Sequence, residues 1–391
     1  MTIDSCVREI LDEIVAIRRD LHAHPETAYE EERTAGIIAA ELRQIPLMEV
    51  EEGVGDTPGV VGVLRRDLPG PCVGLRADMD ALAMEDACGQ EWASTITGKA
   101  HTCGHDGHTA ALIGAARVLG VLQERLMHPV KFIFQPAEEG GAGAERLCKA
   151  GVLKDPDVAV IYGMHGWPWL PKGTVGVASG PILAASTSME ITITGRGGHA
   201  AMPHQTVDPV YVSAQVITAL QSIISRNLNP WEPGVISVCK VDAGSAFNVI
   251  PDSVHMLGTV RALSNETSDF LFDRIRETVG QVAAAFGAYG EVTFDDPYPA
   301  TVNHPSALKA FKQSIKPEKV KVQKVEPVMG GEDFSFYGQQ IPANFWFLGV
   351  QDPEAAETPL LHQPAYDFPD DQLGLAIKLH ARSALGKVDG V

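Results

Sequence analysis

The sequence is short of positive charge. It carries 31 lysine and arginine residues against 50 aspartate and glutamate residues, which gives a formal net charge of −19. Nucleic acid is itself a polyanion and would be repelled by this charge, and no run of basic residues offsets the imbalance. We therefore expect a protein that has no nucleic-acid partner.

Long apolar runs and regularly spaced cysteines are also missing. The longest apolar stretches are far shorter than a membrane span. Residues 1–19 carry acidic side chains and lack the hydrophobic segment of a signal peptide. The six cysteines are scattered without the spacing of a disulfide framework. These absences predict a cytoplasmic protein with no membrane partner, whose thiols are free unless one of them binds metal.

The length and the apolar pattern together indicate two domains of different construction. A chain of 391 residues exceeds the usual size of a single hydrophobic core. Apolar runs typical of buried strands alternate with helical stretches, which favours an α/β domain with helices on both faces of a sheet. The runs expected to form its strands are Gly59–Leu64, Cys72–Leu75, Val130–Phe134, Val158–Tyr162 and Phe345–Val350.

The middle of the chain follows another plan. Its expected elements come in the order β-α-β-β-α-β, which is the ferredoxin-like arrangement. We predict an α/β domain formed by residues 1–184 plus 298–391, with residues 185–297 inserted as a smaller domain; the resemblance described below implies that the first is the catalytic domain and the second a lid and dimerisation domain. The expected elements of the insert are the strands Met189–Thr194, Val235–Val241, Val254–Ala262 and Glu291–Phe294 and the helices Val207–Arg226 and Asp269–Ala285.

Four short segments bring metal-binding side chains next to the ends of expected strands or helices. Ligands of an open α/β sheet bind beyond the carboxyl ends of the strands, so these segments should meet at one edge. Cys103 and His105 can both reach a metal from a looped backbone. Mixed nitrogen, sulfur and oxygen donors suit zinc, and manganese, cobalt or nickel are alternatives. The segments are His101–His108, Gln135–Glu139, Gly163–His165 and Leu361–His362.

Two adjacent glutamates, Glu138 and Glu139, follow the expected strand Val130–Phe134. Neighbouring side chains of an extended chain point to opposite sides, so one carboxylate can bind metal while the other faces a metal-bound water. The metal lowers the pKa of that water towards ~7, and the second carboxylate can accept its proton. The pair therefore indicates amide hydrolysis without a protein nucleophile. The donors outnumber the ligands of one open tetrahedral site, which favours two metals.

These segments and several others resemble the M20 metallopeptidase family in its amidohydrolase branch, with hippurate hydrolase and the hydrolases of indole-acetyl amino acid conjugates. The resemblance extends over nearly the whole chain. It implies a zinc-exopeptidase-like α/β catalytic domain with a central mixed sheet, interrupted by an inserted ferredoxin-like α+β lid domain. The motifs that carry it are Arg76-Ala-Asp-Met-Asp80, His101-Thr-Cys-Gly-His-Asp-Gly-His108, Gln135-Pro-Ala-Glu-Glu-Gly140, Gly197-Gly-His-Ala-Ala-Met-Pro-His204, Phe247-Asn-Val-Ile-Pro251, Met329-Gly-Gly-Glu-Asp-Phe334 and Leu361-His362.

The resemblance also implies a role for each matching residue. Glu138 is expected to act as the general base and later to donate the proton to the leaving amine. In the inserted domain, His199 is expected to polarise the substrate carbonyl and Asn248 to lie near the substrate. Arg261 is expected to meet the substrate carboxylate, because a guanidinium binds a carboxylate with two hydrogen bonds. Asp80 is expected to orient a metal ligand by hydrogen bonding. The implied metal ligands are Cys103, His105, Glu139, His165 and His362.

Several of these residues also have ordinary structural explanations. Cys103 could be a small buried hydrophobe, or a cysteine nucleophile that would leave the paired glutamates without a task. The pair Glu138–Glu139 could form a solvated turn, and His165 could be a histidine of the core. Trp167 and Trp169 could line an acyl pocket or simply pack a loop.

With the resemblance, the sequence predicts a metal-dependent amidohydrolase that cleaves the amide bond of N-acyl L-amino acids such as hippurate, with aromatic or aliphatic acyl groups. The expected cofactors are two divalent ions, Zn²⁺ or Mn²⁺, with Co²⁺ or Ni²⁺ as alternatives. The insert should offer an edge strand and a helical face, so we expect a homodimer, or a homotetramer, through it. Two other classes stay open: a dipeptidase or carboxypeptidase of the same fold, and a non-catalytic small-molecule binding protein. The latter would be expected to have lost Glu138 or a ligand, and here all are present.

Overall fold

The computed structural model describes residues 1–355 and 357–386, and the chain separates into two compact units. Unit 1 comprises Met1–Ile182, Val302–Glu326 and Asp333–Val391, and unit 2 comprises Leu183–Thr301 and Pro327–Glu332. The last part of the predicted catalytic domain, residues 387–391, lies outside the described residues. The chain passes from one unit to the other near β7 (Gly180–Leu183) and β14 (Thr301–Asn303).

A mixed sheet of eight strands forms the centre of the described part of unit 1. Its strand order is β1-β2-β4-β3-β5-β16-β6-β15, and β4, β3, β5 and β16 run parallel to one another. β3 and β4 are buried along their whole length, as expected for parallel strands that are covered on both faces. The strands are β1 (Met48–Glu52), β2 (Val60–Leu64), β3 (Cys72–Asp78), β4 (Val130–Gln135), β5 (Val158–Pro171), β6 (Thr174–Val177), β15 (Lys321–Lys324) and β16 (Ala343–Gln351).

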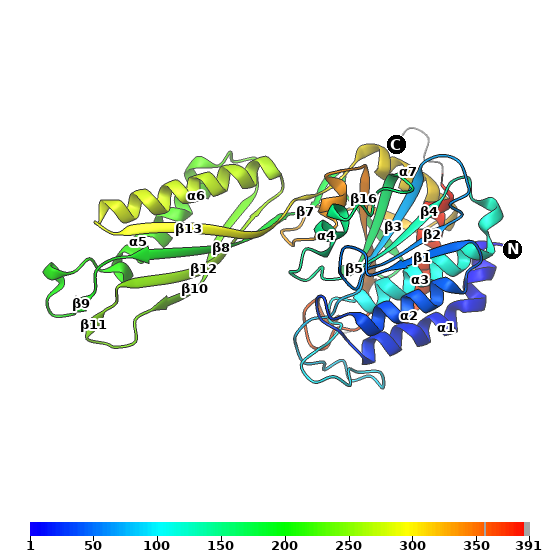
Figure 1. Ribbon diagram of the computed structural model, residues 1–391, viewed down its shortest axis with the longest axis horizontal. Helices are drawn as coiled ribbons and strands as arrows, with labels where there is room; N and C mark the ends of the chain where they lie inside the picture. The colour runs from blue at the N-terminus through cyan, green and yellow to red at the C-terminus, as the bar shows by residue number, and fades with distance from the viewer. Residues whose placement is uncertain (356, 387–391) are drawn as a thin grey trace. The chain divides into compact units, whose positions relative to one another are not determined.

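Helices cover this sheet. α1, α3 and α9 pack against one another, and α1, α2 and α3 lie along one side of the sheet in Figure 1. α4 contacts α8 and β4. A capping box starts α1, because the Thr2 side chain accepts a hydrogen bond from the Ser5 N–H. The helices are α1 (Ile3–Ala23), α2 (Glu32–Arg43), α3 (His105–Val121), α4 (Gly143–Lys149), α7 (Pro305–Ile315), α8 (Ser335–Gly338) and α9 (Leu373–Leu385).

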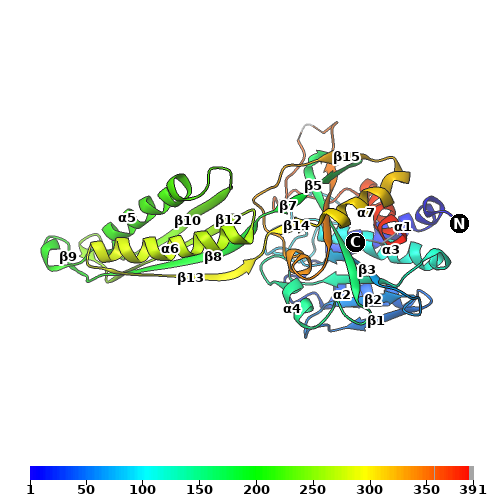
Figure 2. The same cartoon turned by 90° about the horizontal axis from the view of Figure 1, so that it is seen from above.

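The described part of unit 2 is an antiparallel sheet of the order β10-β12-β8-β13 with two helices packed on it. Figures 1 and 2 show both helices, α5 and α6, on one face of this sheet, and apolar side chains of the helices and strands form a separate core there. The elements are β8 (Ala185–Thr194), β9 (Gly198–His199), α5 (Pro209–Ser222), β10 (Gly234–Ala243), β11 (Val249–Ile250), β12 (Ser253–Ala262), α6 (Asn265–Ala285) and β13 (Tyr289–Tyr298).

The mixed sheet of unit 1 and the β-α-β-β-α-β order of unit 2 confirm the predicted fold class. One strand is much longer than expected. The predicted strand Val158–Tyr162 continues as β5 to Pro171, because the residues beyond Tyr162 keep pairing with β16. No helix among the described residues is both long enough and apolar enough to cross a membrane.

Candidate metal centre

The predicted donors of unit 1 gather where β3, β4 and β5 run side by side. β3 ends at Asp78, and β5 carries His165. α3 begins at His105, directly after Gly104, whose φ of +90° is a backbone conformation that glycine adopts without strain. The turn at Gly104 therefore places Cys103 and His105 at the same edge of the sheet.

Two local predictions at this edge are wrong. Gly163–His165 was expected to follow a strand, but His165 lies within β5. Glu138 and Glu139 were expected on an extended chain, but residues 138–140 form a turn in which the Gly140 N–H donates to the Glu138 carbonyl at 2.8 Å. The two side chains therefore need not diverge: an oxygen of each lies within 4.8 Å of the other and of a His105 nitrogen.

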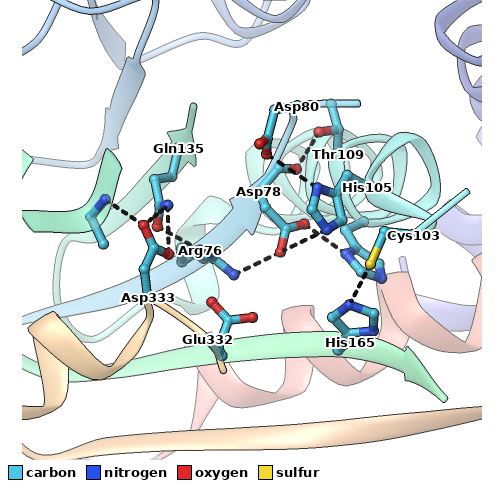
Figure 3. A network of polar contacts seen from close by, with 12 residues as sticks. Arg76, Asp78, Asp80, Cys103, His105, Thr109, Gln135, His165, Glu332 and Asp333 are labelled. Atoms are coloured by element: carbon cyan, nitrogen blue, oxygen red, sulfur yellow. Dashed lines mark hydrogen bonds and ion pairs between the residues drawn. The ribbon is translucent and has the colours of Figure 1, made fainter. Parts of the chain in front are cut away.

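The five residues implied as metal ligands lie together. Cys103, His105 and His165 form a group whose candidate ligand atoms are within 4.8 Å of one another, and Cys103, Glu139 and His362 form a second. Cys103 Sγ is 3.3 Å from His165 Nε2, as Figure 3 shows, and Glu139 Oε1 is 3.0 Å from His362 Nε2. Cys103 belongs to both groups, so its sulfur lies within 4.8 Å of a candidate ligand atom of each of the other four residues.

Asp80 connects two of these residues. Its Oδ1 lies 3.2 Å from Nδ1 of His105, and its Oδ2 accepts a hydrogen bond from the Glu139 N–H at 2.9 Å. The Asp80–His105 contact, visible in Figure 3, is the kind that fixes the orientation of a metal-binding imidazole. Asp80 therefore has the contacts expected of a residue that orients ligands.

A second carboxylate, Asp78, ties the cluster to the sheet. Its Oδ1 lies 2.6 Å from His108 Nδ1, and its Oδ2 accepts a hydrogen bond from Arg76 at 2.8 Å. Arg76 donates in turn to Asp333 at 3.0 Å, and Figure 3 shows the contacts of Arg76 with Asp78 and Asp333. All four residues are buried, so the network has little freedom to rearrange.

The buried carboxylates change the protonation of His105 and Cys103. Burial alone would lower the pKa of His105, but the charges of Asp78 and Asp80 outweigh burial and raise this pKa to about 10. Burial, followed by the charges of Glu139 and Glu138, raises the pKa of the Cys103 thiol well above its ordinary value. The cluster therefore favours an added positive charge and disfavours a thiolate until such a charge is present.

The donor set fits divalent metal ions. Nε2 of His105 is buried and has no hydrogen-bond partner within residues 1–355 and 357–386. A thiol, three imidazoles and a carboxylate are donors that zinc and related metals bind. A cation beside His105 would satisfy this nitrogen and offset the surrounding negative charge.

The three candidate residues of unit 2 lie on its strands and the loop beside them. His199 ends β9, which pairs with β11, and the Ala200 N–H donates to the Asn248 carbonyl at 3.1 Å. Both His199 and Asn248 are exposed. Arg261, on β12, is half-buried and donates a hydrogen bond to the Ser186 hydroxyl. No carboxylate among the described residues forms an ion pair with Arg261.

Sequence reasoning missed Glu31. This buried carboxylate accepts a hydrogen bond from the Ala137 N–H at 2.8 Å, and Ala137 has a φ of +54° just before Glu138. Burial, with the charge of Asp80, raises the pKa of Glu31 to about 8. The sequence offers only an acidic residue between two helices here, which nothing distinguishes from a surface residue.

Known proteins match this chain along nearly all of its length. Residues 74–385 match the model of peptidase family M20/M25/M40. The chain is 37% identical to thermostable carboxypeptidase 1 of Saccharolobus solfataricus, over 97% of this chain and 96% of that protein. It is 39% identical to IAA-amino acid hydrolase ILR1-like 4 of Arabidopsis thaliana, over 96% of this chain and 86% of that protein.

A solved structure agrees with these matches. The Bacillus subtilis YXEP protein, described as a dinuclear metal binding peptidase from the M20 family, is 34% identical with a TM-score of 0.84, covering 97% of this chain and 98% of that chain. The chain belongs to peptidase family M20/M25/M40. These matches confirm the predicted family and enzyme class. This M20 enzyme is a metal-dependent hydrolase of amide bonds in small molecules. Divalent metal ions are its cofactors.

Proposed function

We propose that this M20 enzyme cleaves the amide bond between an acyl group and an L-amino acid, with N-benzoylglycine (hippurate) as a representative substrate. The observation that carries the proposal is the cluster in which candidate ligand atoms of Glu138, Glu139 and His105 lie within 4.8 Å of one another, while Glu139 also lies within 4.8 Å of Cys103 and His362. A relative at 39% identity is named as a hydrolase of IAA-amino acids, and this name supports an N-acyl amino acid as the substrate.

Two divalent ions would be held by Cys103, His105, Glu139, His165 and His362. Zn²⁺ or Mn²⁺ suits these donors, and Co²⁺ or Ni²⁺ are alternatives. When bound, the ions supply the positive charge that acidifies the attacking water and polarises the substrate carbonyl.

Glu138 is the proton carrier of the proposed reaction. Its carboxylate is buried beside His105 and Glu139, and it removes a proton from the water that attacks the carbonyl carbon. The same carboxyl then donates this proton to the nitrogen of the leaving amine as the C–N bond breaks. Asp80 keeps Glu139 and His105 in place during both transfers, through the two contacts described above.

The unit 2 residues are proposed to bind the substrate. The Ala201 N–H donates to Nδ1 of His199 at 3.1 Å, which leaves the proton of a neutral imidazole on Nε2. This N–H can donate to the carbonyl oxygen as negative charge develops on it. Arg261 offers a guanidinium to the carboxylate of the amino acid, and Asn248 lies on the loop beside His199.

We also propose that the enzyme is a homodimer, or a homotetramer, assembled through unit 2. β10 is at the edge of the four-stranded sheet, and its outer side pairs with no other strand in the described part of the chain. Such an edge is open to pairing with a second copy. Sedimentation that shows only monomer at working concentrations would contradict this proposal.

Comparing rates on N-benzoylglycine and on unblocked dipeptides tests the proposed substrate. The enzyme is first reconstituted with each candidate metal. We expect the N-acyl amino acid to have the higher kcat/KM with at least one metal. Faster cleavage of the dipeptides would instead identify a peptidase, and the 37% identical carboxypeptidase makes this the second candidate.

A further inference from the structure

A row of aromatic side chains leads away from His165 along β5. The ring of Trp167 meets the ring of His165 edge-on, with centroids 6.1 Å apart. Trp167 is stacked on Phe347 of β16 at 4.1 Å and 10°, and its other neighbour, Trp169, is tilted at 4.6 Å. The row is therefore in direct contact with a candidate metal ligand at one end.

Exposure rises along this row. Phe347 is fully buried, Trp167 is half-buried and Trp169 is 51% exposed. The stacked contact with Phe347 fixes the orientation of the inner ring. The row thus has a fixed base inside the unit and an indole at its outer end that is open to solvent.

The backbone is irregular where Trp169 lies. Trp167 of β5 pairs with Gly349 of β16, and the next recorded pair joins Pro171 to Gln351. Between these two pairs the chain advances four residues along β5 but only two along β16. Extra residues of this kind form a bulge, and bulges beside active sites turn a side chain in a new direction. Leu170 is buried within this irregular segment, so the strand is anchored to the core without the exposed ring of Trp169.

We propose that Trp169 and the exposed part of Trp167, supported by the buried ring of Phe347, form an aromatic platform that binds the acyl group of the substrate, and that the preferred acyl group carries an aromatic ring. The inference rests on the proposed function and makes it more specific, since that function admits aliphatic and aromatic acyl groups alike. It assigns a role to the two tryptophans, for which the sequence left an acyl pocket and loop packing equally open.

The chemistry of the platform favours a flat ring over a small aliphatic chain. Aromatic rings attract one another in offset or edge-to-face arrangements at centroid distances of about 4.5–7 Å, beyond the gain from burying apolar area. An acetyl group has no ring to stack and covers little of an indole. The platform therefore discriminates between acyl groups by whether they carry a ring.

The test compares N-benzoylglycine with N-acetylglycine, which differ only in the acyl group. In the metal-loaded enzyme, Trp169→Ala should lower the ratio of kcat/KM for the benzoyl over the acetyl substrate by about tenfold. Trp169→Phe keeps a ring and should restore most of this ratio. Trp231→Ala removes a tryptophan that is 92% exposed on unit 2 and should leave the ratio unchanged.

Two results would overturn the platform: an equal loss on both substrates in Trp169→Ala, or no loss on the benzoyl substrate. If the wild-type enzyme hydrolyses neither substrate, the proposed function fails, and calorimetry on the acyl products still decides the inference. The platform requires benzoate to bind more weakly to Trp169→Ala than to the wild type, while acetate binding stays the same. Unchanged benzoate binding would refute it.

Discussion

The two units hold their candidate functional residues in opposite ways. In unit 1, Cys103, His105 and Asp80 are buried and held by contacts with residues from other elements, and His362 is the exposed member of the set. In unit 2, His199 and Asn248 are exposed, and Arg261 donates to a neighbouring hydroxyl without a carboxylate partner among the described residues. The buried residues of unit 1 are fixed before any substrate binds, whereas the residues of unit 2 can still form hydrogen bonds or an ion pair with a substrate.

This difference separates chemistry from recognition. A buried, fixed cluster can stabilise charge in a transition state without reorganising at the moment of reaction. Exposed groups gain a partner when substrate arrives, so their contribution should be seen in catalysis and binding but not in folding. The predictions below test this division, beginning with the largest expected effect.

Glu138→Gln should lower kcat by about 1,000-fold, because an amide of the same shape cannot accept the proton of the attacking water. Bound metal should stay at the wild-type level, since Glu138 is not a proposed ligand. Steady-state kinetics and metal analysis of the same sample check both parts. The matched control is Glu145→Gln on α4, whose carboxylate pairs with Lys149 at the surface. Full activity of Glu138→Gln would refute its role.

His199→Ala should lower kcat by about 100-fold, because it removes a donor to the developing oxyanion. The thermal unfolding midpoint should not change, since the side chain is exposed. Kinetics and a thermal melt on one preparation measure the two effects. His204→Ala, at another exposed histidine of the same segment, is the control. A wild-type kcat in His199→Ala would contradict the proposed division.

Asp80→Asn should weaken metal binding by about ten- to a hundredfold, because the side chain that orients His105 loses its charge. Competition with a chelator of known affinity measures the change. Asp12→Asn, at an exposed carboxylate of α1, should bind metal as the wild type does. If Asp80→Asn binds metal equally well, the buried contacts of unit 1 are not what fixes the ligands.

Arg261→Ala should raise KM for N-benzoylglycine by about tenfold and leave kcat nearly unchanged. The reason is that the proposed ion pair with the substrate carboxylate stabilises the bound substrate and the transition state equally. Arg226→Ala removes an exposed arginine of the same unit and serves as the control. A fall in kcat at constant KM would show that Arg261 acts on the reacting carbonyl instead.

The architecture could be predicted because it depends on periodicity. Patterns that extend over many residues indicated the strands β3 and β4 and the ferredoxin-like order of unit 2. The ligand set needed the family resemblance, because His362 has no local signal and approaches Glu139 only through the fold. Periodicity places elements, but it does not bring distant loops together.

Finer details depended on interactions that a local pattern cannot show. β5 runs on past Tyr162 because β16 continues beside it. Glu138 and Glu139 lie in a turn and not on an extended chain, after the left-handed backbone of Ala137. Glu31 accepts a hydrogen bond from the Ala137 N–H although the two residues are far apart in the sequence, so no local pattern could indicate this contact.

The most direct test of the account is a metal titration of the metal-free enzyme, in which bound metal per chain and turnover of N-benzoylglycine are measured on the same samples. We expect turnover to appear with bound metal and to reach its maximum at two divalent ions per chain, and Cys103→Ala to bind less metal. Failure to bind Zn²⁺, Mn²⁺, Co²⁺ or Ni²⁺, or binding of two ions without any hydrolysis of N-acyl amino acids, would contradict the account.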